Sequence, residues 1–177
     1  MVARTDGGLV SRAQSGQLDA FEELVRRHRL STYRVALRML GDESDAEYAT
    51  QDAFVQAWRN LDGFRADAAF STWMYRIVTN RCLNMLRARR RTEPLPDDRE
   101  APASRPDRIA EARWQVEDLK LAIGRLTPEQ RAPLVLGELQ GCSYEEIAQA
   151  LDLSISAVKS RLHRARLELL SAMGPWR

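Results

Sequence analysis

Apolar residues recur at spacings of three and four along most of the chain, which is the period of an amphipathic helix. The segments with this pattern are residues 18–40, 44–61, 69–91, 109–126 and 143–170. Alternation of apolar and polar residues, which would indicate half-buried strands, is almost absent. The pattern therefore predicts an all-α fold.

Residues that favour helix ends lie at the borders of these segments. Gly41 follows the first long segment, and Thr127 with Pro128 has the order of an N-cap and a first helical residue. Three pairs have the spacing of a side-chain cap: Asp19 with Glu22, Ser44 with Glu47, and Ser143 with Glu146. We expect a helix to begin at each pair. Pro133 removes a backbone donor inside a helix and predicts a kink there.

Residues 92–110 interrupt the helical pattern. They contain four of the seven prolines, together with acids and small residues. Proline fixes its own backbone angle and lacks a donor, so this composition predicts a flexible linker. The chain of 177 residues then consists of two small helical domains, at residues 8–91 and 111–173.

The net charge of +2 conceals a strong segregation of charge. Residues 41–52 contain five acids and no base, whereas residues 68–92 contain six arginines and no acid. An acidic face complements a basic protein partner, and a basic face complements nucleic acid. The acids could equally form an ordinary solvated helix face, and the composition alone leaves both interpretations open.

Other classes of protein find little support in the sequence. Cys82 and Cys142 lie far apart, so neither a disulfide framework nor a zinc cluster is indicated, and we expect no metal or cofactor. Residues 1–20 lack the apolar core of a signal peptide, and no apolar run approaches the length of about eighteen residues typical of a membrane span. We therefore expect a protein of the reducing cytoplasm that does not insert into membranes.

The closing segment has the organisation of a helix-turn-helix. A short helix is expected at residues 144–151, followed by a turn at Asp152 and a second helix capped by Ser154 or Ser156. Aspartate tolerates the left-handed backbone of such a turn better than most residues. The second helix exposes polar and basic side chains that suit phosphates and base edges: Lys159, Ser160, Arg161, His163, Arg164 and Arg166. The alternative is an amphipathic helix pair with a solvated basic face.

The basic segment at residues 69–91 differs in kind, because aromatic and amide side chains accompany its arginines. The accompanying residues are Trp73, Tyr75, Asn80 and Asn84. Aromatic rings stack on unpaired bases, at roughly 1–3 kcal/mol per base, while arginines hold phosphates. We expect this helix to bind strand-separated nucleic acid. Trp73 could instead be a core residue, and residues 87–91 a solvated helix end favoured by the helix dipole.

In this order and spacing, the segments resemble a bacterial RNA polymerase sigma factor of the extracytoplasmic-function (ECF) class. Residues 45–65 (DAEYATQDAFVQAWRNLDGFR) are similar to its regions 2.1–2.2. Residues 70–91 (FSTWMYRIVTNRCLNMLRARRR) are similar to its regions 2.3–2.4, and residues 126–170 to its region 4. The resemblance covers nearly the whole chain outside the predicted linker.

The resemblance implies a dissociable initiation subunit that binds core RNA polymerase and melts promoter DNA without nucleotide hydrolysis. Region 2 of the family binds the polymerase clamp and the non-template single strand of the −10 element. Region 4 reads the −35 element as duplex and docks on the β flap. An anti-sigma factor is an expected further partner.

Carried over position by position, the resemblance implies three groups of contact residues. Those toward the polymerase clamp are Asp45, Glu47, Gln51, Asp52, Phe54 and Trp58. Those toward the −10 element are Phe64, Arg65, Asp67, Ala68, Phe70, Ser71, Trp73, Arg76, Asn80, Arg87 and Arg90. Those toward the −35 element are Ser156, Lys159, Ser160, Arg161, His163 and Arg164.

The predicted linker is long enough for this role. Two promoter elements separated by two DNA turns lie about 70 Å apart. About twenty extended residues span at most roughly 65–70 Å, and the widths of the two domains add to that reach.

Other functions compete with this interpretation. A stand-alone helix-turn-helix regulator would explain residues 143–170, but it leaves the aromatic and basic segment unexplained. A helical adaptor would bind protein only. An enzyme is disfavoured, because the sequence has no glycine-rich phosphate loop and no nucleophile beside a base. His28 and His163 are too isolated to form a metal site, and we expect His28 at a helix surface or packing edge.

Overall fold

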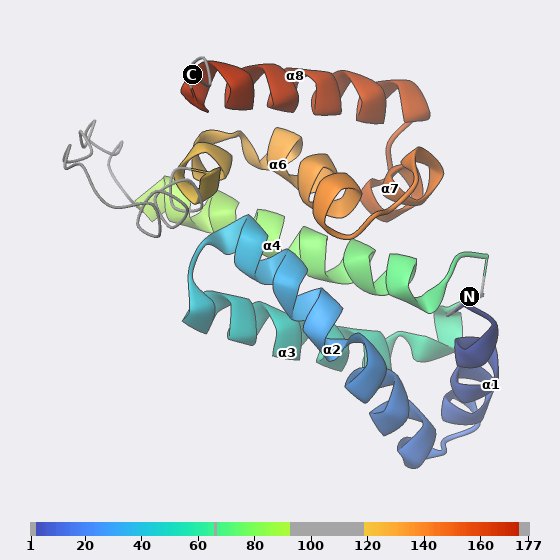
Figure 1. Cartoon of the computed structure of the whole chain (residues 1–177). Coiled ribbons are helices and arrows are strands. Elements are labelled where there is room, and N and C mark those ends of the chain that lie inside the picture. Colours follow the sequence, from blue (N-terminus) through green and yellow to red (C-terminus); the bar gives the residue numbers. More distant parts are fainter. Residues whose placement is uncertain (1–2, 66, 93–118, 174–177) are drawn as a thin grey trace, which may run out of the picture.

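The computed structural model describes residues 3–65, 67–92 and 119–173 of the chain (Figure 1). The elements in these ranges are all helical: α1 (Ala3–Gln14), α2 (Leu18–Leu40), α3 (Glu43–Arg59), η1 (Leu61–Gly63), α4 (Phe70–Thr92), α6 (Pro128–Leu134), η2 (Val135–Leu139), α7 (Tyr144–Leu151) and α8 (Ile155–Met173). Residues 119–125 form a further helical stretch before α6. The predicted all-α fold is confirmed. The linker predicted at residues 92–110 lies outside the described residues, except for Thr92 at the end of α4.

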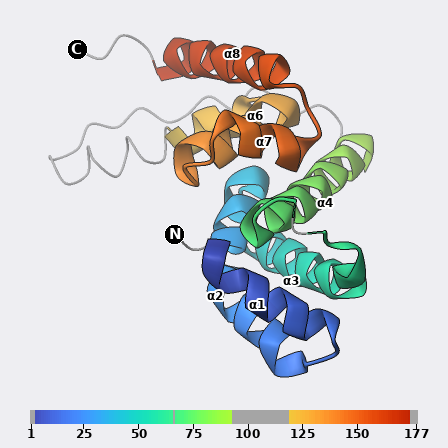
Figure 2. The ribbon, with the colours of Figure 1, turned by 90° about the vertical axis from the view of Figure 1, so that its right-hand side faces the viewer.

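Helices α1 to α4 form what we term the N-terminal module, residues 3–92. Helices α2, α3 and α4 pack against one another, and α1 packs on α2 (Figures 1 and 2). Small side chains let helix axes approach closely. The stripe that α3 and η1 bury in this way is Ala46, Ala49, Ala53, Ala57 and Leu61.

The two ends of α2 differ in how well the sequence predicts them. Gly41 ends the helix in the left-handed conformation, with φ at 73°, and its N–H donates to the carbonyl of Leu37. This stop signal is confirmed. The cap predicted from Asp19 and Glu22 is wrong, because α2 already begins at Leu18 and both acids lie inside its first turn.

The start of α3 also differs from the prediction. Asp42 is the N-cap, and its carboxylate accepts a hydrogen bond of 2.9 Å from the N–H of Asp45. The cap predicted from Ser44 and Glu47 is wrong, because the helix begins ahead of Ser44. Two good N-cap residues stand close together here, and the earlier one is used.

Helix α1 is absent from the sequence prediction, whose first helical segment begins at residue 18. It packs on α2 through Val10 and Ala13, which are buried. Asp6 of α1 is also buried, with Oδ2 lying 2.7 Å from Nε2 of His28, and Arg27 donates to its other oxygen. His28 is therefore buried against a distant carboxylate where α1 packs on α2, so of the two predicted placements, a helix surface or a packing edge, the helix surface is wrong.

The C-terminal module, residues 119–173, follows its predicted signals closely. Helix α6 begins with Thr127 as N-cap and Pro128 as its first residue, and Gln130 completes a capping box. After Pro133 the α-helix continues only to Leu134, and η2 then has π-helical bonding. Proline has no amide hydrogen for the helical ladder, so the predicted disturbance takes the form of a change in helix type.

The helix-turn-helix prediction is confirmed. Helix α7 begins with the reciprocal capping box of Ser143 and Glu146. It ends at Asp152, which has the left-handed conformation with φ 54° and ψ 52°. Ser154 caps α8 by accepting a hydrogen bond from the N–H of Ala157 at 3.2 Å.

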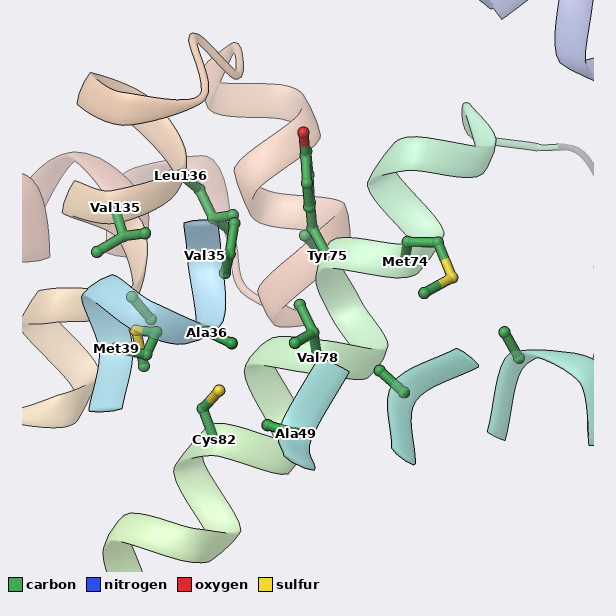
Figure 3. Packing of buried hydrophobic residues seen from close by; sticks show 14 of the residues in the cluster. Val35, Ala36, Met39, Ala49, Met74, Tyr75, Val78, Cys82, Val135 and Leu136 are labelled. Atoms are coloured by element: carbon green, nitrogen blue, oxygen red, sulfur yellow. The ribbon is translucent and has the colours of Figure 1, made fainter. Parts of the chain in front are cut away.

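The two modules pack against each other in one continuous hydrophobic core. Val35, Ala36 and Met39 of α2 lie beside Val135 and Leu136 of η2 (Figure 3). Helices α6 and α7 lie over α2 and α4, and α8 is the outermost layer (Figures 1 and 2). The described part of the chain is thus a stack in which the helix-turn-helix covers part of the N-terminal module.

Candidate nucleic-acid and protein interfaces

Three aromatic rings meet where the loop after η1 joins α4. The ring centroids of Phe64 and Trp73 lie 4.8 Å apart. Phe70 lies 6.0 Å from Phe64, edge to face, and 5.7 Å from Trp73. Phe70 is buried, whereas Phe64 and Trp73 are half-buried. Trp73 therefore belongs to a packed cluster and still keeps part of its ring at the surface.

A pocket of about 410 Å³ opens beside these rings. Its walls in the N-terminal module are Gly63, Phe64, Arg65, Asp67, Ala68, Thr72, Trp73 and Arg76. A cavity of this size accommodates a small planar ligand. It offers rings for stacking and guanidinium groups for phosphate. Most residues that the sequence assigns to the loop at 64–71 thus line a single cavity.

The backbone of this loop is held by α1. Nε2 of Gln14 donates to the carbonyl oxygens of Leu61 and Phe64, each at 3.0 Å. One bond is part-buried and the other exposed, and together they tie the carboxamide to both sides of the η1 turn. The sequence analysis missed this residue, because no local signal links Gln14 to carbonyls 47 and 50 positions later.

Helix α4 presents one side to solvent. With 100° per residue, five side chains fall within about 80° of one another on this side: Trp73, Arg76, Asn80, Asn84 and Arg87. Trp73 is half-buried and the others are exposed. Of the remaining predicted contacts, Arg90 is exposed near the end of α4 and Ser71 is half-buried in its first turn. The predicted row of base and phosphate contacts thus forms a continuous surface.

Two acids of α3 pair with arginines of α4. Asp45 forms an ion pair with Arg89, and Oδ2 of Asp52 lies 3.0 Å from Nε of Arg81. The side chains of Asp45 and Asp52 are 33% and 31% exposed. Partly exposed pairs contribute little to stability. They nevertheless link the acidic block of the sequence to its basic block across the α3–α4 contact.

The outer side of α3 is polar and aromatic. Glu47, Gln51 and Trp58 are exposed, and Phe54 is buried beneath them. Trp58 packs its ring 4.8 Å from that of Phe21. A groove of about 520 Å³ runs beside α2 and is lined by Glu22, Val25, Arg26, Arg29, Leu30, Tyr33 and Glu47. Exposed aromatic residues with a polar rim are typical of a protein interface.

Helix α8 buries one stripe and exposes the other. Val158, Leu162 and Ala165 are buried in the C-terminal module. The predicted contact residues lie outside this stripe. Arg161 is half-buried, and the exposed ones are Ser156, Lys159, Ser160, His163 and Arg164.

Two contacts orient arginines on α8. Nη2 of Arg164 donates to Oγ of Ser160 at 3.0 Å. Arg166 pairs with Glu138 of η2 at 2.6 Å. The basic side of α8 is thus partly ordered within the module before any ligand binds.

The described residues hold no group of His, Cys, Asp and Glu arranged for a metal ion. None of the helices in these ranges is long and apolar enough to cross a membrane. Cys82 and Cys142 are free thiols, and burial raises their pKa values to about 12 and about 11. Both thiols are therefore poor nucleophiles at neutral pH.

Both modules match known protein families. Residues 24–92 match Sigma-70 region 2, and residues 117–169 match Sigma-70, region 4. The solved structure of CnrH in complex with the cytosolic domain of CnrY has a similar fold, with a TM-score of 0.72 and 32% identity, covering 95% of this chain and 96% of that chain. The fold and the two regions together define a sigma factor of RNA polymerase.

Sequence relatives show which type of sigma factor the chain is. The chain is 38% identical over 157 residues to the ECF RNA polymerase sigma factor SigE of Mycolicibacterium smegmatis. This match covers 86% of this chain and 61% of that protein. It is 36% identical over 171 residues to the ECF RNA polymerase sigma factor SigM of Mycobacterium tuberculosis, covering 97% of this chain and 86% of that protein. The chain therefore belongs to the ECF sigma factors, the dissociable initiation factors that its sequence resembles.

Proposed function

We propose that this chain directs core RNA polymerase to a particular set of promoters, with the N-terminal module acting on the −10 element and the C-terminal module on the −35 element. One observation carries the proposal: a single chain presents two surfaces of different chemistry. One is an aromatic pocket beside an arginine-bearing helix, and the other is the exposed basic helix of a helix-turn-helix. A stand-alone DNA-binding regulator needs only the second surface.

The aromatic pocket captures one base of the non-template strand. Extruding a base from the stack costs a few kcal/mol. Stacking on an aromatic ring such as Phe64 or Trp73 offsets roughly 1–3 kcal/mol of that cost. Arg76, Asn80 and Arg87 follow on the same side of α4 and contact the nucleotides beyond the captured base. Strand separation then draws on binding energy alone and needs no nucleotide hydrolysis.

Helix α8 enters the major groove of the −35 duplex. Its exposed side chains, such as Lys159 and Arg164, lie outside the buried stripe that holds α8 in its module. Phosphate contacts set the position and make the affinity depend on salt, whereas contacts to base edges specify the sequence. Helix α7 crosses the sugar-phosphate backbone of the DNA, as the first helix of a helix-turn-helix does.

The outer side of α3 and the groove beside α2 bind the polymerase clamp. Acids there complement a basic partner, and exposed Trp58 supplies apolar contact area. The C-terminal module makes a second polymerase contact at the β flap. CnrH, a protein of similar fold, binds the cytosolic domain of CnrY. Together with the family resemblance, this complex supports an anti-sigma factor as a regulatory partner for the present chain.

The chain between the modules permits the required reach. Thr92 and Leu119 are separated by 26 residues. Fully extended, a segment of this length spans about 90 Å. The two promoter elements lie about 70 Å apart, so the modules can occupy both at once.

Run-off transcription from genomic promoter fragments tests the proposal. Discrete start sites should appear only when core polymerase and the chain are both present, and aligning those promoters should show conserved −35 and −10 elements. A stand-alone regulator would instead bind specific duplex tightly by itself and give no stimulation of the polymerase.

A further inference from the structure

A buried imidazole lies next to the aromatic rings beside the pocket. The ring centroids of His28 on α2 and Phe70 on α4 are 5.1 Å apart, and the ring planes are tilted by 56°. Phe70 in turn contacts Phe64 and Trp73, the two rings that line the pocket. His28 and Phe70 are both buried. The rings that line the pocket are thus linked to His28 through a ring that solvent does not reach.

A carboxylate from α1 fixes the orientation of this imidazole. Nε2 of His28 lies 2.7 Å from Oδ2 of Asp6, and Arg27 donates to the other carboxylate oxygen at 3.2 Å. A carboxylate only accepts hydrogen bonds, so Nε2 carries the hydrogen and donates it. Asp6 is also buried, and a buried polar group without a partner is costly. The pair therefore holds the imidazole in one orientation against Phe70.

Phe70 holds the first turn of α4 in place. It is the first residue of that helix, and Trp73 follows in the same turn. The N–H groups of a first turn have no partners within the helix, and helix ends fray. Close-packed interiors transmit displacements from one side chain to the next. A loss of packing at Phe70 would therefore let this turn move, and Trp73 would move with it.

This support comes entirely from the N-terminal module. Asp6, His28 and Phe70 lie on α1, α2 and α4, and these three helices pack together (Figure 2). The C-terminal module contributes only Gln149 and Asp152 to the wall of the pocket. The support of the rings thus does not depend on where the C-terminal module lies.

We infer that His28 is a positioning residue for promoter opening. Its imidazole, oriented by Asp6, holds Phe70 and so keeps the pocket rings ready to stack on a base. The inference rests on the proposed capture of a −10 base in this pocket. His28 is itself buried and acts through Phe70 rather than by touching DNA. A surface that is ordered before binding loses less entropy when it binds, so a fixed pair of rings favours capture.

Two substitutions separate positioning from a purely structural role. The bond between Asp6 and His28 also joins α1 to α2, so breaking it should lower stability in any case. His28→Gln keeps an amide that can donate to Asp6 but has no ring to place against Phe70. His28→Phe keeps a ring against Phe70 but cannot donate to Asp6. The first variant should therefore impair positioning, and the second should impair stability.

Fluorine NMR of the whole chain labelled with 5-fluorotryptophan follows the position of Trp73 without DNA. The chain has four tryptophans, and Trp73→Phe identifies the resonance of Trp73 by its loss. His28→Gln should broaden or split this resonance, because the indole ring then takes several positions. His28→Phe should leave a single sharp line.

Reconstituted holoenzyme measures the effect on promoter opening. His28→Gln should slow open-complex formation, followed by permanganate reactivity, about 2- to 10-fold, which is the effect of losing one aromatic contact. Initial promoter binding in a gel shift should change little. His28→Phe should open the promoter at close to the original rate, although its midpoint of urea denaturation should be lower.

The matched control is Asp42→Ala, which removes the cap of α3 at the end remote from η1. It should lower stability. The Trp73 resonance and the rate of opening should both stay as in the original chain.

Two results would overturn the inference. One is a Trp73 resonance in His28→Gln as sharp as in the original chain, while circular dichroism shows intact helices. The other is a loss of opening in proportion to the loss of stability across His28→Gln, His28→Phe and Asp42→Ala. If His28→Gln does not fold, His28→Phe decides: a sharp line with normal opening supports positioning, and a broadened line overturns it.

Failure of the proposed function looks different. The Trp73 resonance would still respond to the variants as expected, yet holoenzyme with the original chain would yield no run-off transcript.

Discussion

Helices α4 and α8 both turn basic side chains toward solvent, but they differ in what accompanies them. On α4, the exposed arginines follow a cluster in which Phe64 and Trp73 lie 4.8 Å apart. Residues 155–173 of α8 contain no Phe, Trp or Tyr, and Tyr144 of α7, whose ring centroid lies 5.6 Å from Nζ of Lys159, is a single ring rather than part of a cluster. Unpaired bases offer ring faces for stacking, whereas a duplex offers base edges and phosphates. A cluster of aromatic rings beside the arginines, more than the number of arginines, therefore distinguishes the surface proposed for single-stranded DNA from the surface proposed for duplex DNA.

Removing an aromatic ring from the cluster beside α4 should have the largest effect. Trp73→Ala should reduce open-complex formation roughly 10- to 100-fold, because a stacked base contributes about 1–3 kcal/mol. Permanganate footprinting with the reconstituted holoenzyme measures opening, and gel shift measures initial binding, which should change much less. Trp73→Phe keeps a ring and should retain most of the opening. Equal losses in both steps would contradict the assignment.

Removing a basic side chain from α8 should weaken binding to duplex DNA rather than strand opening. Arg164→Gln on α8 should weaken binding to a −35 duplex by about 1–3 kcal/mol if the side chain reads a base. If it contacts a phosphate, the loss of affinity should be similar for all DNA sequences. The slope of log affinity against log salt concentration should then become shallower by about one. Fluorescence anisotropy at several salt concentrations distinguishes these cases. Open-complex formation at saturating holoenzyme should persist, and its parallel loss would argue against separate roles for the modules.

Removing a helix cap from either module should have a smaller effect, which is a loss of folding stability. Ser143→Ala should lower the free energy of unfolding by about 1 kcal/mol through α7, and Asp42→Ala should do the same through α3. Urea denaturation followed by circular dichroism measures both. Ser44→Ala is the control and should change little, because Ser44 lies inside α3. A loss at Ser44 as large as at Asp42 would mean that α3 begins later than described.

The smallest effect concerns the two thiols. Burial raises the pKa of Cys82 to about 12 and that of Cys142 to about 11, so the reactive thiolate is scarce at pH 7. Reaction with a disulfide reagent should be slow at neutral pH and faster as pH rises. Cys82, the more buried of the two, should react last. Rapid modification of Cys82 in the folded chain at pH 7 would show that the N-terminal core opens.

Much of the fold could be predicted because its signals are local. Gly41, Thr127 and Ser143 act on backbone groups within four residues, and helical periodicity needs only a short window. The start of α3 shows the limit of this reasoning. Asp42 and Ser44 are both good N-caps, and their spacing alone does not say which one the helix uses.

Contacts between distant residues could not be predicted in this way. The pairing of His28 with Asp6 joins two helices, and the contact of Tyr75 with Gln140 joins two modules. Each partner looks unremarkable in its own stretch of sequence. The residues of the aromatic pocket could be predicted because they are close in sequence and match a family motif. The wall contributed by Asp152 could not, because it depends on how the modules pack.

Under the proposed function, Gln14 gives the N-terminal helix a part in promoter opening that its position in the chain does not suggest. Its carboxamide donates to the carbonyls of Leu61 and Phe64, so α1 supports the loop that we propose captures the base. Proteolytic trimming of α1, or a bulky fusion that frays it, would leave both DNA-binding helices intact. A chain altered in this way would still find its promoters and would open them slowly. Helix α1 would thus set the strength of the response without changing which genes respond.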